Sequence, residues 1–399
     1  MKSFNLFSFL KGDRVIWMIA ILLSLLSLLA VYSSIVALAY KHQNGATEYY
    51  LFKHGKLIIL GFVLMFITHR IPYNYFSRIS QIMLIISIPL LIYTLLHGAN
   101  LNEANRWIAI PGIGLTFQSS DFAKLALIMY VARIVTQKQN ELTDFKAVLI
   151  HIMTPVFIVC GLILPANFST AAILLCTCLI LMFIGRVPLK HIFKVLGIAI
   201  AGFAFLLMLG NFFPKTLPRL QVWENRIVEF FKGKEEQDPD KSYQANHAKI
   251  AIATGGFMGM GAGNSTQRNF LPQAYSDFIY AIIIEEYGSL LGGVGIVLLY
   301  LILLFRGVRV ATKTKKTFGA LLSFGLAFSL VFQGFINMAV AVNLFPVTGQ
   351  PLPFLSMGGT SLLFSSIAIG IILSVSRQTE NDTEDFSEPS IEKGAALAT

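Results

Sequence analysis

The sequence predicts an all-α polytopic membrane protein with about ten transmembrane helices, both termini in the cytoplasm and one long extracytoplasmic loop. Three observations support this fold class. Hydrophobic residues make up 55% of the 399 residues and charged residues only 13%, whereas soluble domains carry roughly 25% charged residues. Apolar runs long enough to cross a bilayer core of about 30 Å recur along the chain. Lys and Arg gather in alternate short breaks between these runs, as the positive-inside rule expects.

These observations exclude a disordered protein, an ordinary soluble enzyme and a nucleic-acid-binding module, although the formal net charge is +10. The first run, Val15–Ala39, contains no charged residue and is too long for the apolar region of a signal peptide. Further spans are expected at about 57–72, 79–97, 117–137, 146–164, 168–185, 192–213, 277–305, 318–344 and 354–376.

The basic residues predict the orientation of these spans. With the N-terminus inside, the inner segments hold most of the Lys and Arg found in short breaks, and the loop 40–56 is the exception. The long segment of about 214–276 then lies outside, and an amphipathic pattern at 223–231 predicts a helix that lies at the interface or packs on other loop segments. Residues 1–377 are expected to form one transmembrane domain, and 378–399 a disordered, acidic cytoplasmic tail.

Asp121 and Lys124 are polar residues that a membrane span does not require. They lie three residues apart in the predicted fourth span, so they share one helix face and can pair. Charged groups at membrane depth are costly and usually functional. Two interpretations stay open: a salt bridge that only tethers helices, and a charged wall beside an anionic substrate.

Asp277 opens the predicted eighth span directly after the long outer segment. This position suits a helix cap as well as a catalytic carboxylate. Glu285 and Glu286 follow eight and nine residues later, which in one continuous helix would place them about 12–13 Å deeper.

The stretch from Pro346 to Ser361 carries three prolines and three glycines between two apolar runs. So much Pro and Gly interrupts a helix, and irregular backbone at membrane depth is tolerated only inside protein or beside a wet cavity. We therefore expect a cavity wall here. The glycine-rich run Gly255–Gly263 lacks the Lys-Ser/Thr ending of a phosphate loop, and the three cysteines and seven histidines show no metal-ligand spacing.

Five signatures, in order along the chain, resemble the SEDS family of polymerases (shape, elongation, division and sporulation), its FtsW branch more than its RodA branch. They cover Asn105–Ile108, Gln118–Asp121 with Lys124, Pro165–Thr170, Ser276–Gly288 and Pro346–Ser361. Three positions depart from the family pattern: Ser119 replaces a Pro, Asp121 replaces a Glu, and Asn167 replaces an acidic residue.

The resemblance implies a peptidoglycan glycosyltransferase that polymerises lipid II, an undecaprenyl-pyrophosphate disaccharide-pentapeptide, at the outer face of the bacterial cytoplasmic membrane during septal division. The family's essential Asp corresponds to Asp277. The candidate substrate-binding residues are Arg106, Asp121, Lys124, Gln244, Glu285 and Ser356. The expected partners are a class B penicillin-binding protein and other division proteins, with no nucleic acid. No cofactor is expected, and a divalent cation such as Mg²⁺ stays an open alternative without a visible ligand set.

Three other functions remain as alternatives. An elongation polymerase of the RodA type would use the same chemistry. A transporter that flips lipid II would suit buried charges and a broken helix. A scaffold that only anchors division proteins would leave Asp121, Lys124 and Asp277 unexplained.

Overall fold

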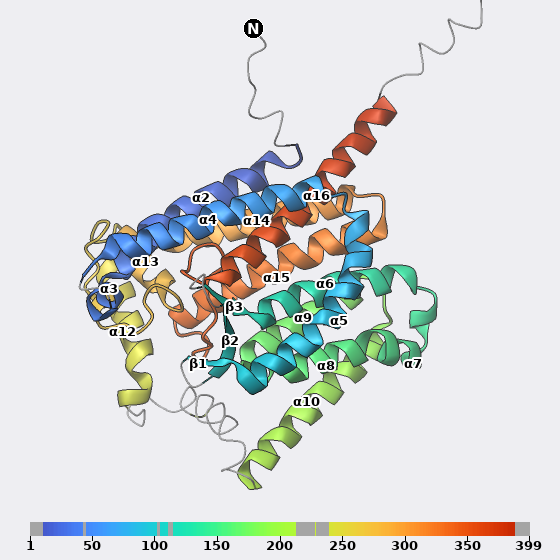
Figure 1. Ribbon diagram of the computed structural model, residues 1–399, viewed down its shortest axis with the longest axis horizontal. Helices are drawn as coiled ribbons and strands as arrows, with labels where there is room; N and C mark the ends of the chain where they lie inside the picture. Colours follow the sequence, from blue (N-terminus) through green and yellow to red (C-terminus); the bar gives the residue numbers. More distant parts are fainter. Residues whose placement is uncertain are drawn as a thin grey trace, which may run out of the picture.

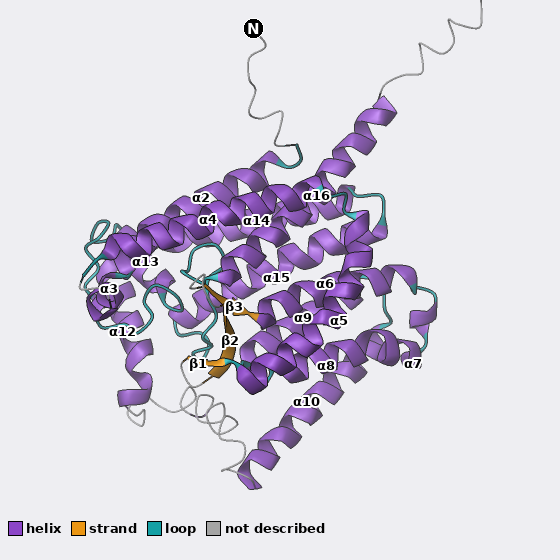
Figure 2. Ribbon diagram, in the orientation of Figure 1, coloured by secondary structure: helices purple, strands orange, loops and turns teal. Residues whose placement is uncertain are grey.

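The computed structural model describes residues 11–42, 45–101, 104–110, 115–212, 228 and 239–387 (Figure 1). Helices account for most of these residues (Figure 2). The predicted amphipathic helix at 223–231 lies outside the described residues, apart from Val228. The helices are α2 (Arg14–Ser34), α3 (Val36–His42), α4 (Thr47–Arg70), α5 (Asn74–His97), α6 (Ser119–Gln137), α7 (Phe145–Val148), α8 (Thr154–Ile163), α9 (Phe168–Ile184), α10 (Leu189–Phe212), α12 (Pro239–Gly255), α13 (Ile279–Tyr287), α14 (Gly295–Lys313), α15 (Thr317–Ala341) and α16 (Thr360–Ser387).

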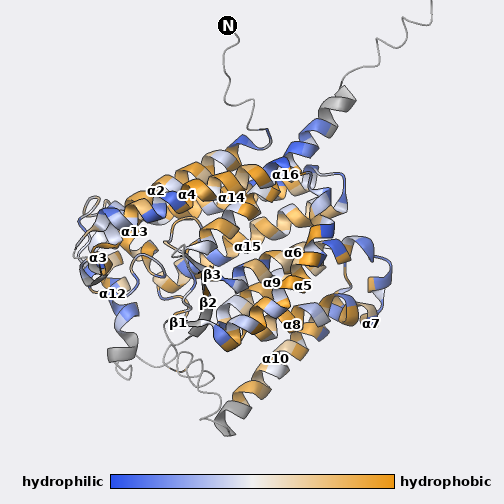
Figure 3. Cartoon of the chain, viewed as in Figure 1, coloured by the Kyte–Doolittle hydropathy of each residue, from blue (hydrophilic) through white to orange (hydrophobic). Residues whose placement is uncertain are grey.

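The chain is a polytopic helical membrane protein. Within the described residues, eight helical segments are long and apolar enough to cross a bilayer; apolar residues cover most of their length in Figure 3. The two other predicted spans coincide with α9, a shorter apolar helix, and with α6, which carries Asp121, Lys124 and Arg133. Each expected span therefore meets a helix, while the number of crossings and their orientation stay predictions.

Helices α2, α4, α14 and α16 lie side by side (Figure 1). Small residues allow the close approach of α4 and α16, as is common between membrane helices. A Cβ atom on Gly61 would lie 2.7 Å from Ser366 Oγ, and one on Gly370 would lie 1.9 Å from Thr68 Oγ1. Helix α4 begins ten residues before the predicted start at 57, and in this first part His54 lies 2.8 Å from Ser27 of α2.

The predicted outer loop near 98–116 is instead a small antiparallel sheet of strands β1 (Ala99–Leu101), β2 (Ala104–Ile110) and β3 (Leu115–Gln118). In register, Trp107 of β2 pairs with Ala99 of β1 and with Gln118 of β3. The backbone N–H of Gln118 donates to Thr360 Oγ1 over 3.0 Å. The sheet thereby connects the start of α6 to the start of α16.

The predicted eighth span is not one continuous helix. Helix α13 ends at Gly288, which has a φ of +78°, and the π-helix η4 (Gly288–Val294) folds back along α13. Tyr280 Oη donates to the carbonyl of Gly293 over 3.1 Å, and a Cβ on Gly292 would lie 2.5 Å from the carbonyl oxygen of Ile283. Residues nine and thirteen apart in a straight helix would be about 14–20 Å apart. The chain therefore forms a hairpin with α13 as one arm and η4, continued by α14, as the other.

The hairpin corrects the expected depth of the carboxylates. Glu285 and Glu286 lie near the turn at Gly288, where η4 begins, rather than deeper than Asp277. Ser33, at the end of α2, donates a hydrogen bond to Glu286. Ser27, earlier on α2, donates to the carbonyl of Leu355, in the loop that bonds to the backbone next to Asp277. These two serines are six residues apart on α2, about 9 Å along its axis, so the turn at Leu355 lies further into the bundle than Glu286.

The predicted boundary of the C-terminal tail at 377 is also wrong. Helix α16 continues to Ser387, and its residues from Arg377 to Glu380 still contact the bundle. Arg377 donates to the carbonyl of Arg70 over 2.9 Å, Thr379 lies 3.0 Å from Thr314, and Glu380 accepts from the N–H of Gly12 over 3.0 Å.

Candidate active site

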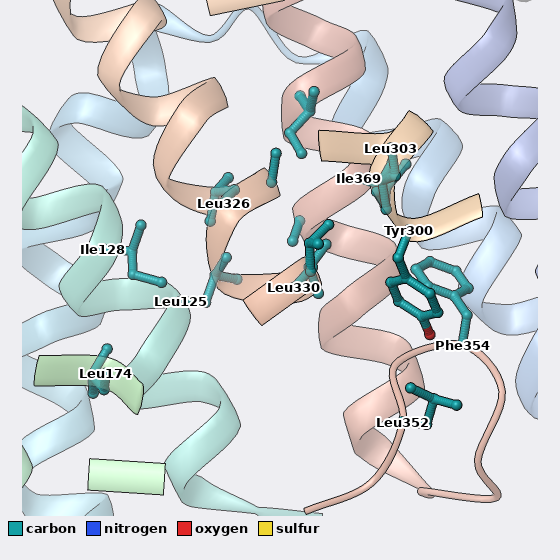
Figure 4. Close-up of a cluster of buried hydrophobic side chains, with 14 of the residues drawn as sticks. Leu125, Ile128, Leu174, Tyr300, Leu303, Leu326, Leu330, Leu352, Phe354 and Ile369 are labelled. Atoms are coloured by element: carbon teal, nitrogen blue, oxygen red, sulfur yellow. The ribbon is translucent and has the colours of Figure 1, made fainter. Parts of the chain in front are cut away.

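The Pro- and Gly-rich segment predicted as a cavity wall is a loop of residues 342–359 that folds back into the bundle. Gln333 Nε2, two turns before the end of α15, donates to the carbonyl of Pro351 over 2.9 Å. Asn337 Nδ2 donates to the carbonyl of Gln350 over 2.7 Å. Leu352, Phe354 and Leu355 are at most 3% exposed, and in Figure 4 Phe354 lies beside the ring of Tyr300. This irregular backbone is therefore buried in protein at the depth of the helices, which satisfies its polar groups, while its role as a cavity wall stays a prediction.

Asp277 lies where this loop meets the segment that precedes α13. Ser356 Oγ donates to the carbonyl of Ser276 over 2.6 Å, and the N–H of Met357 donates to the carbonyl of Tyr275 over 2.9 Å. Asn337 Nδ2 also donates to the carbonyl of Asp277 over 2.8 Å. The backbone on both sides of Asp277 is therefore fixed by the loop and by α15, while its side chain is half-buried.

The helix-cap interpretation of Asp277 is wrong. Helix α13 begins at Ile279 with Phe278 at the N-cap position. Asp277 precedes the cap, and its Oδ1 accepts from Ser276 Oγ over 3.1 Å. Tyr275 interacts electrostatically with both Asp277 and Tyr50 of α4, which places the face of α4 that carries Tyr50 close to the site.

Asp121 and Lys124 form the expected pair. Lys124 Nζ lies 3.2 Å from Asp121 Oδ1, with 13% and 5% of the side chains exposed. Lys124 Nζ also donates to Gln333 Oε1 of α15 over 2.7 Å. Asp121 Oδ2 has no hydrogen-bond partner within the described residues, and the pair lines a cavity of about 20 Å³ together with Ser361 and Ser365. A polar cavity of this size has room for roughly one water molecule.

Gln333 and Asn337 are functional candidates that the sequence reasoning missed. They lie four residues apart on α15, about 6 Å along its axis, and they connect Lys124, the loop and the backbone of Asp277. The signal was present, because two amides at this spacing in an apolar span are costly unless they have partners. Both side chains are at most 3% exposed.

Glu285 does not join this cluster. Its buried carboxylate accepts hydrogen bonds from the hydroxyl of Ser265, from the N–H and hydroxyl of Thr266, and from the N–H of Gln267. These contacts hold the start of the short 3₁₀ helix η3 (Gln267–Asn269) against α13. The structure thus gives Glu285 a role in anchoring the segment Ser265–Gln267, not one beside Asp277.

The other candidate residues named from the sequence lie on separate elements. Arg106 lies in strand β2, and Gln244 is half-buried on α12. Asn167, which replaces an acidic residue of the family pattern, caps α9 through its Oδ1. In the part of the chain that the structure describes, no group of three or more His, Cys, Asp or Glu side chains gathers as metal ligands.

Comparisons with known proteins agree over nearly the whole chain. Residues 13–381 match the family model for FtsW, RodA and SpoVE, described as "Cell cycle protein". A protein of Trichlorobacter lovleyi named "Probable peptidoglycan glycosyltransferase FtsW" is 34% identical and is aligned over 93% of this chain and 94% of its own length. "Stage V sporulation protein E" of Bacillus subtilis is 31% identical over 92% of this chain and 96% of its own length.

Solved structures share the fold. One, described as "Structural coordination of polymerization and crosslinking by a peptidoglycan synthase complex", superimposes with a TM-score of 0.70 at 22% identity, over 92% of this chain and 98% of the other. The rod shape determining protein RodA of Thermus thermophilus gives a TM-score of 0.64 at 21% identity, over 92% and 97% of the two chains.

Proposed function

Because the chain belongs to the FtsW, RodA and SpoVE family of cell cycle proteins, we propose that it is a peptidoglycan glycosyltransferase that polymerises lipid II. The observation that carries the proposal is the placement of Asp277. Its backbone is fixed between the loop 342–359 and α15, its side chain is half-buried, and the helix cap is another residue. A carboxylate held in this way is suited to act as a general base.

In this proposal Asp277 accepts the proton of the acceptor sugar hydroxyl as that oxygen attacks the anomeric carbon of the donor. The bond from the anomeric carbon to the lipid pyrophosphate breaks, and the pyrophosphate leaves with the electron pair. Cationic groups stabilise the charge that develops on it, and Lys124 is the candidate within the bundle. The pyrophosphate bond supplies the driving force, so the proposal assigns no resident cofactor.

The proposal places the reaction at the outer face of the bacterial cytoplasmic membrane and in septal division, since relatives at 34% and 32% identity carry the name FtsW. It also assigns a single-span class B penicillin-binding protein and other division proteins as partners. Depletion that produces filaments would support the division role, whereas round cells would indicate elongation. A transporter of the same lipid is distinguished by its failure to join lipid II units.

Asp277→Asn tests the catalytic assignment. Asn keeps the size and an oxygen that accepts from Ser276, but it loses the basicity. General-base assistance typically contributes 10²–10⁴-fold in rate, so we expect normal expression and lipid II binding with polymerisation reduced by at least about a hundredfold. The measurement is glycan synthesis from lipid II by the full chain with its partner.

Asp144→Asn is the matched control. Asp144 caps α7 by accepting from the N–H of Lys146 over 3.2 Å, and Asn caps nearly as well, so this variant should polymerise at the wild-type rate. Near wild-type synthesis by Asp277→Asn would remove Asp277 from the mechanism.

A further inference from the structure

A buried polar pair, Ser27 of α2 and His54 of α4, contacts the loop beside Asp277, to which α15 also bonds. Both residues are 0% exposed. Ser27 Oγ lies 2.8 Å from His54 Nε2 and donates to the carbonyl of Leu355 over 2.9 Å. Three segments far apart in the sequence therefore meet at one hydroxyl group.

The hydrogen bonds determine which ring nitrogen carries the proton. Ser27 has a single hydroxyl proton, and it is donated to Leu355, so its oxygen must accept from His54 Nε2. His54 Nδ1 has no partner among the described residues. A proton on that buried nitrogen would be an unpaired donor, which is costly. His54 is therefore the neutral tautomer with hydrogen on Nε2.

The carbonyl that the pair holds belongs to a strained part of the loop. Phe354, the preceding residue, has a φ of +66°, which for a residue with a bulky side chain persists only when the surroundings impose it. The same turn returns to the catalytic segment, because the N–H of Leu352 donates to Ser356 Oγ over 2.8 Å and Ser356 donates to the carbonyl of Ser276. Leu355 and Asp277 are thus joined through two residues, Ser356 and Ser276.

We propose that Ser27 and His54 are positioning residues, which fix the turn 352–356 so that Asp277 faces the acceptor hydroxyl. This inference rests on the proposed function, since it assigns the pair a role in the same reaction. An apolar pair would fill the same space without the desolvation of two polar groups. A pair that merely packed α2 on α4 would also need no bond to a third segment.

Ser27→Ala removes the bond to Leu355 and leaves a space smaller than one water molecule. Small misplacements of a catalytic group cost up to about a hundredfold in rate, so we expect kcat for lipid II to fall by about tenfold or more, with KM within about twofold. The matched control is Ser87→Ala. Ser87 is also 0% exposed, but its hydroxyl donates only within its own helix, to Leu84 over 2.7 Å. This control should keep the wild-type kcat.

His54→Gln and His54→Leu separate positioning from packing. The Gln amide can donate to Ser27 in the place of Nε2, so kcat should recover to within about threefold of wild type, whereas Leu of similar bulk should behave like Ser27→Ala. Melting temperatures of all variants, measured in detergent, should match that of Ser87→Ala within a few degrees. Loss of kcat only in proportion to lost folded protein would overturn the proposal.

A spectroscopic measurement tests the hydrogen bonds without activity. In protein labelled with ¹⁵N-histidine, the His54 ring, assigned by its absence in His54→Gln, should show a protonated Nε2 and an unprotonated Nδ1. The opposite tautomer or a cationic ring would overturn the arrangement. An inactive Asp277→Asn together with a wild-type kcat for Ser27→Ala would overturn only the positioning role. An active Asp277→Asn would instead overturn the assignment of Asp277 as the base, independently of the results for Ser27 and His54.

Discussion

Lys124 bonds to side chains of two helices, α6 and α15. Substitutions can therefore test whether the charged pair only tethers helices or forms a wall beside the substrate. Asp121 on α6 neutralises it, and Gln333 on α15 accepts its second hydrogen bond. Because both charged side chains are largely buried, removing one partner leaves an uncompensated charge in the bundle. Such a loss typically costs about 3–5 kcal/mol.

We therefore expect Lys124→Ala and Asp121→Ala each to abolish complementation of a strain that lacks the chromosomal copy. Lys138→Ala is the control, since Lys138 and Glu141 form an ion pair at the same sequence spacing but are 31% and 57% exposed. Exposed pairs contribute about 0–1 kcal/mol, so this variant should complement fully. A double variant of Asp121 and Lys124 that restores activity would show that the pair only tethers helices, and would end its proposed role beside the pyrophosphate.

At the scale of elements, the hairpin of α13 and α14 depends on Gly288. Its φ of +78° disfavours any residue with a Cβ, and a Cβ at this position would lie 2.2 Å from the carbonyl oxygen of Phe257. A backbone in this region costs about 1–3 kcal/mol for other residues, before the clash is counted. The Gly-rich run 255–263 crosses the hairpin here, which gives that run a packing role.

Gly288→Ala should therefore lower the free energy of unfolding by at least about 2 kcal/mol, measured by thermal unfolding in detergent, and should reduce expression. Gly295→Ala provides the comparison in the same hairpin. Its nearest neighbour would lie 3.7 Å from the new Cβ, and its φ is −57°. That variant should be as stable as wild type or more so, since Ala favours a helix by about 1 kcal/mol. Equal stability of the two variants would contradict the hairpin turn.

The sequence predicted the existence and order of the helices because membrane spans have a strong, local signal in hydropathy. It also predicted Asp121, Lys124, Asp277 and the irregular loop, since polar groups and Pro stand out in apolar runs. The hairpin escaped prediction because both of its arms are apolar, so hydropathy reads them as one span. The sheet near Trp107 escaped prediction because its strands have only three to seven residues, too few for a clear alternating pattern. The partners of Glu285 lie 18 to 20 residues away, and periodicity along one segment does not contain such contacts.

At the scale of the whole molecule, the side-chain contacts made along α2 show how far along the helix bundle the site lies. At its start, Asp13 caps the helix and forms an ion pair with Arg306 of α14, 2.5 Å from Nη2. Ser27 contacts the loop beside Asp277, and Ser33 contacts Glu286. Along the axis of α2, Ser27 lies about 21 Å from the level of Asp13 and about 9 Å from that of Ser33. Asp277 is therefore much nearer to the end of the bundle where α12 and α13 lie (Figure 1).

The orientation of the chain in the membrane therefore tests the proposed function. A polymerase of lipid on the outer face needs the end with α12 and α13 outside. In a variant without its three cysteines, Met258→Cys places a thiol beside the α13 hairpin, where the native side chain is 83% exposed. Lys316→Cys places one in the exposed turn between α14 and α15, at the other end. In spheroplasts, an impermeant maleimide should label position 258 at once and position 316 only after lysis, since positive residues of short loops stay inside. The reverse pattern would put Asp277 nearer the cytoplasm and would exclude glycan synthesis at the outer face.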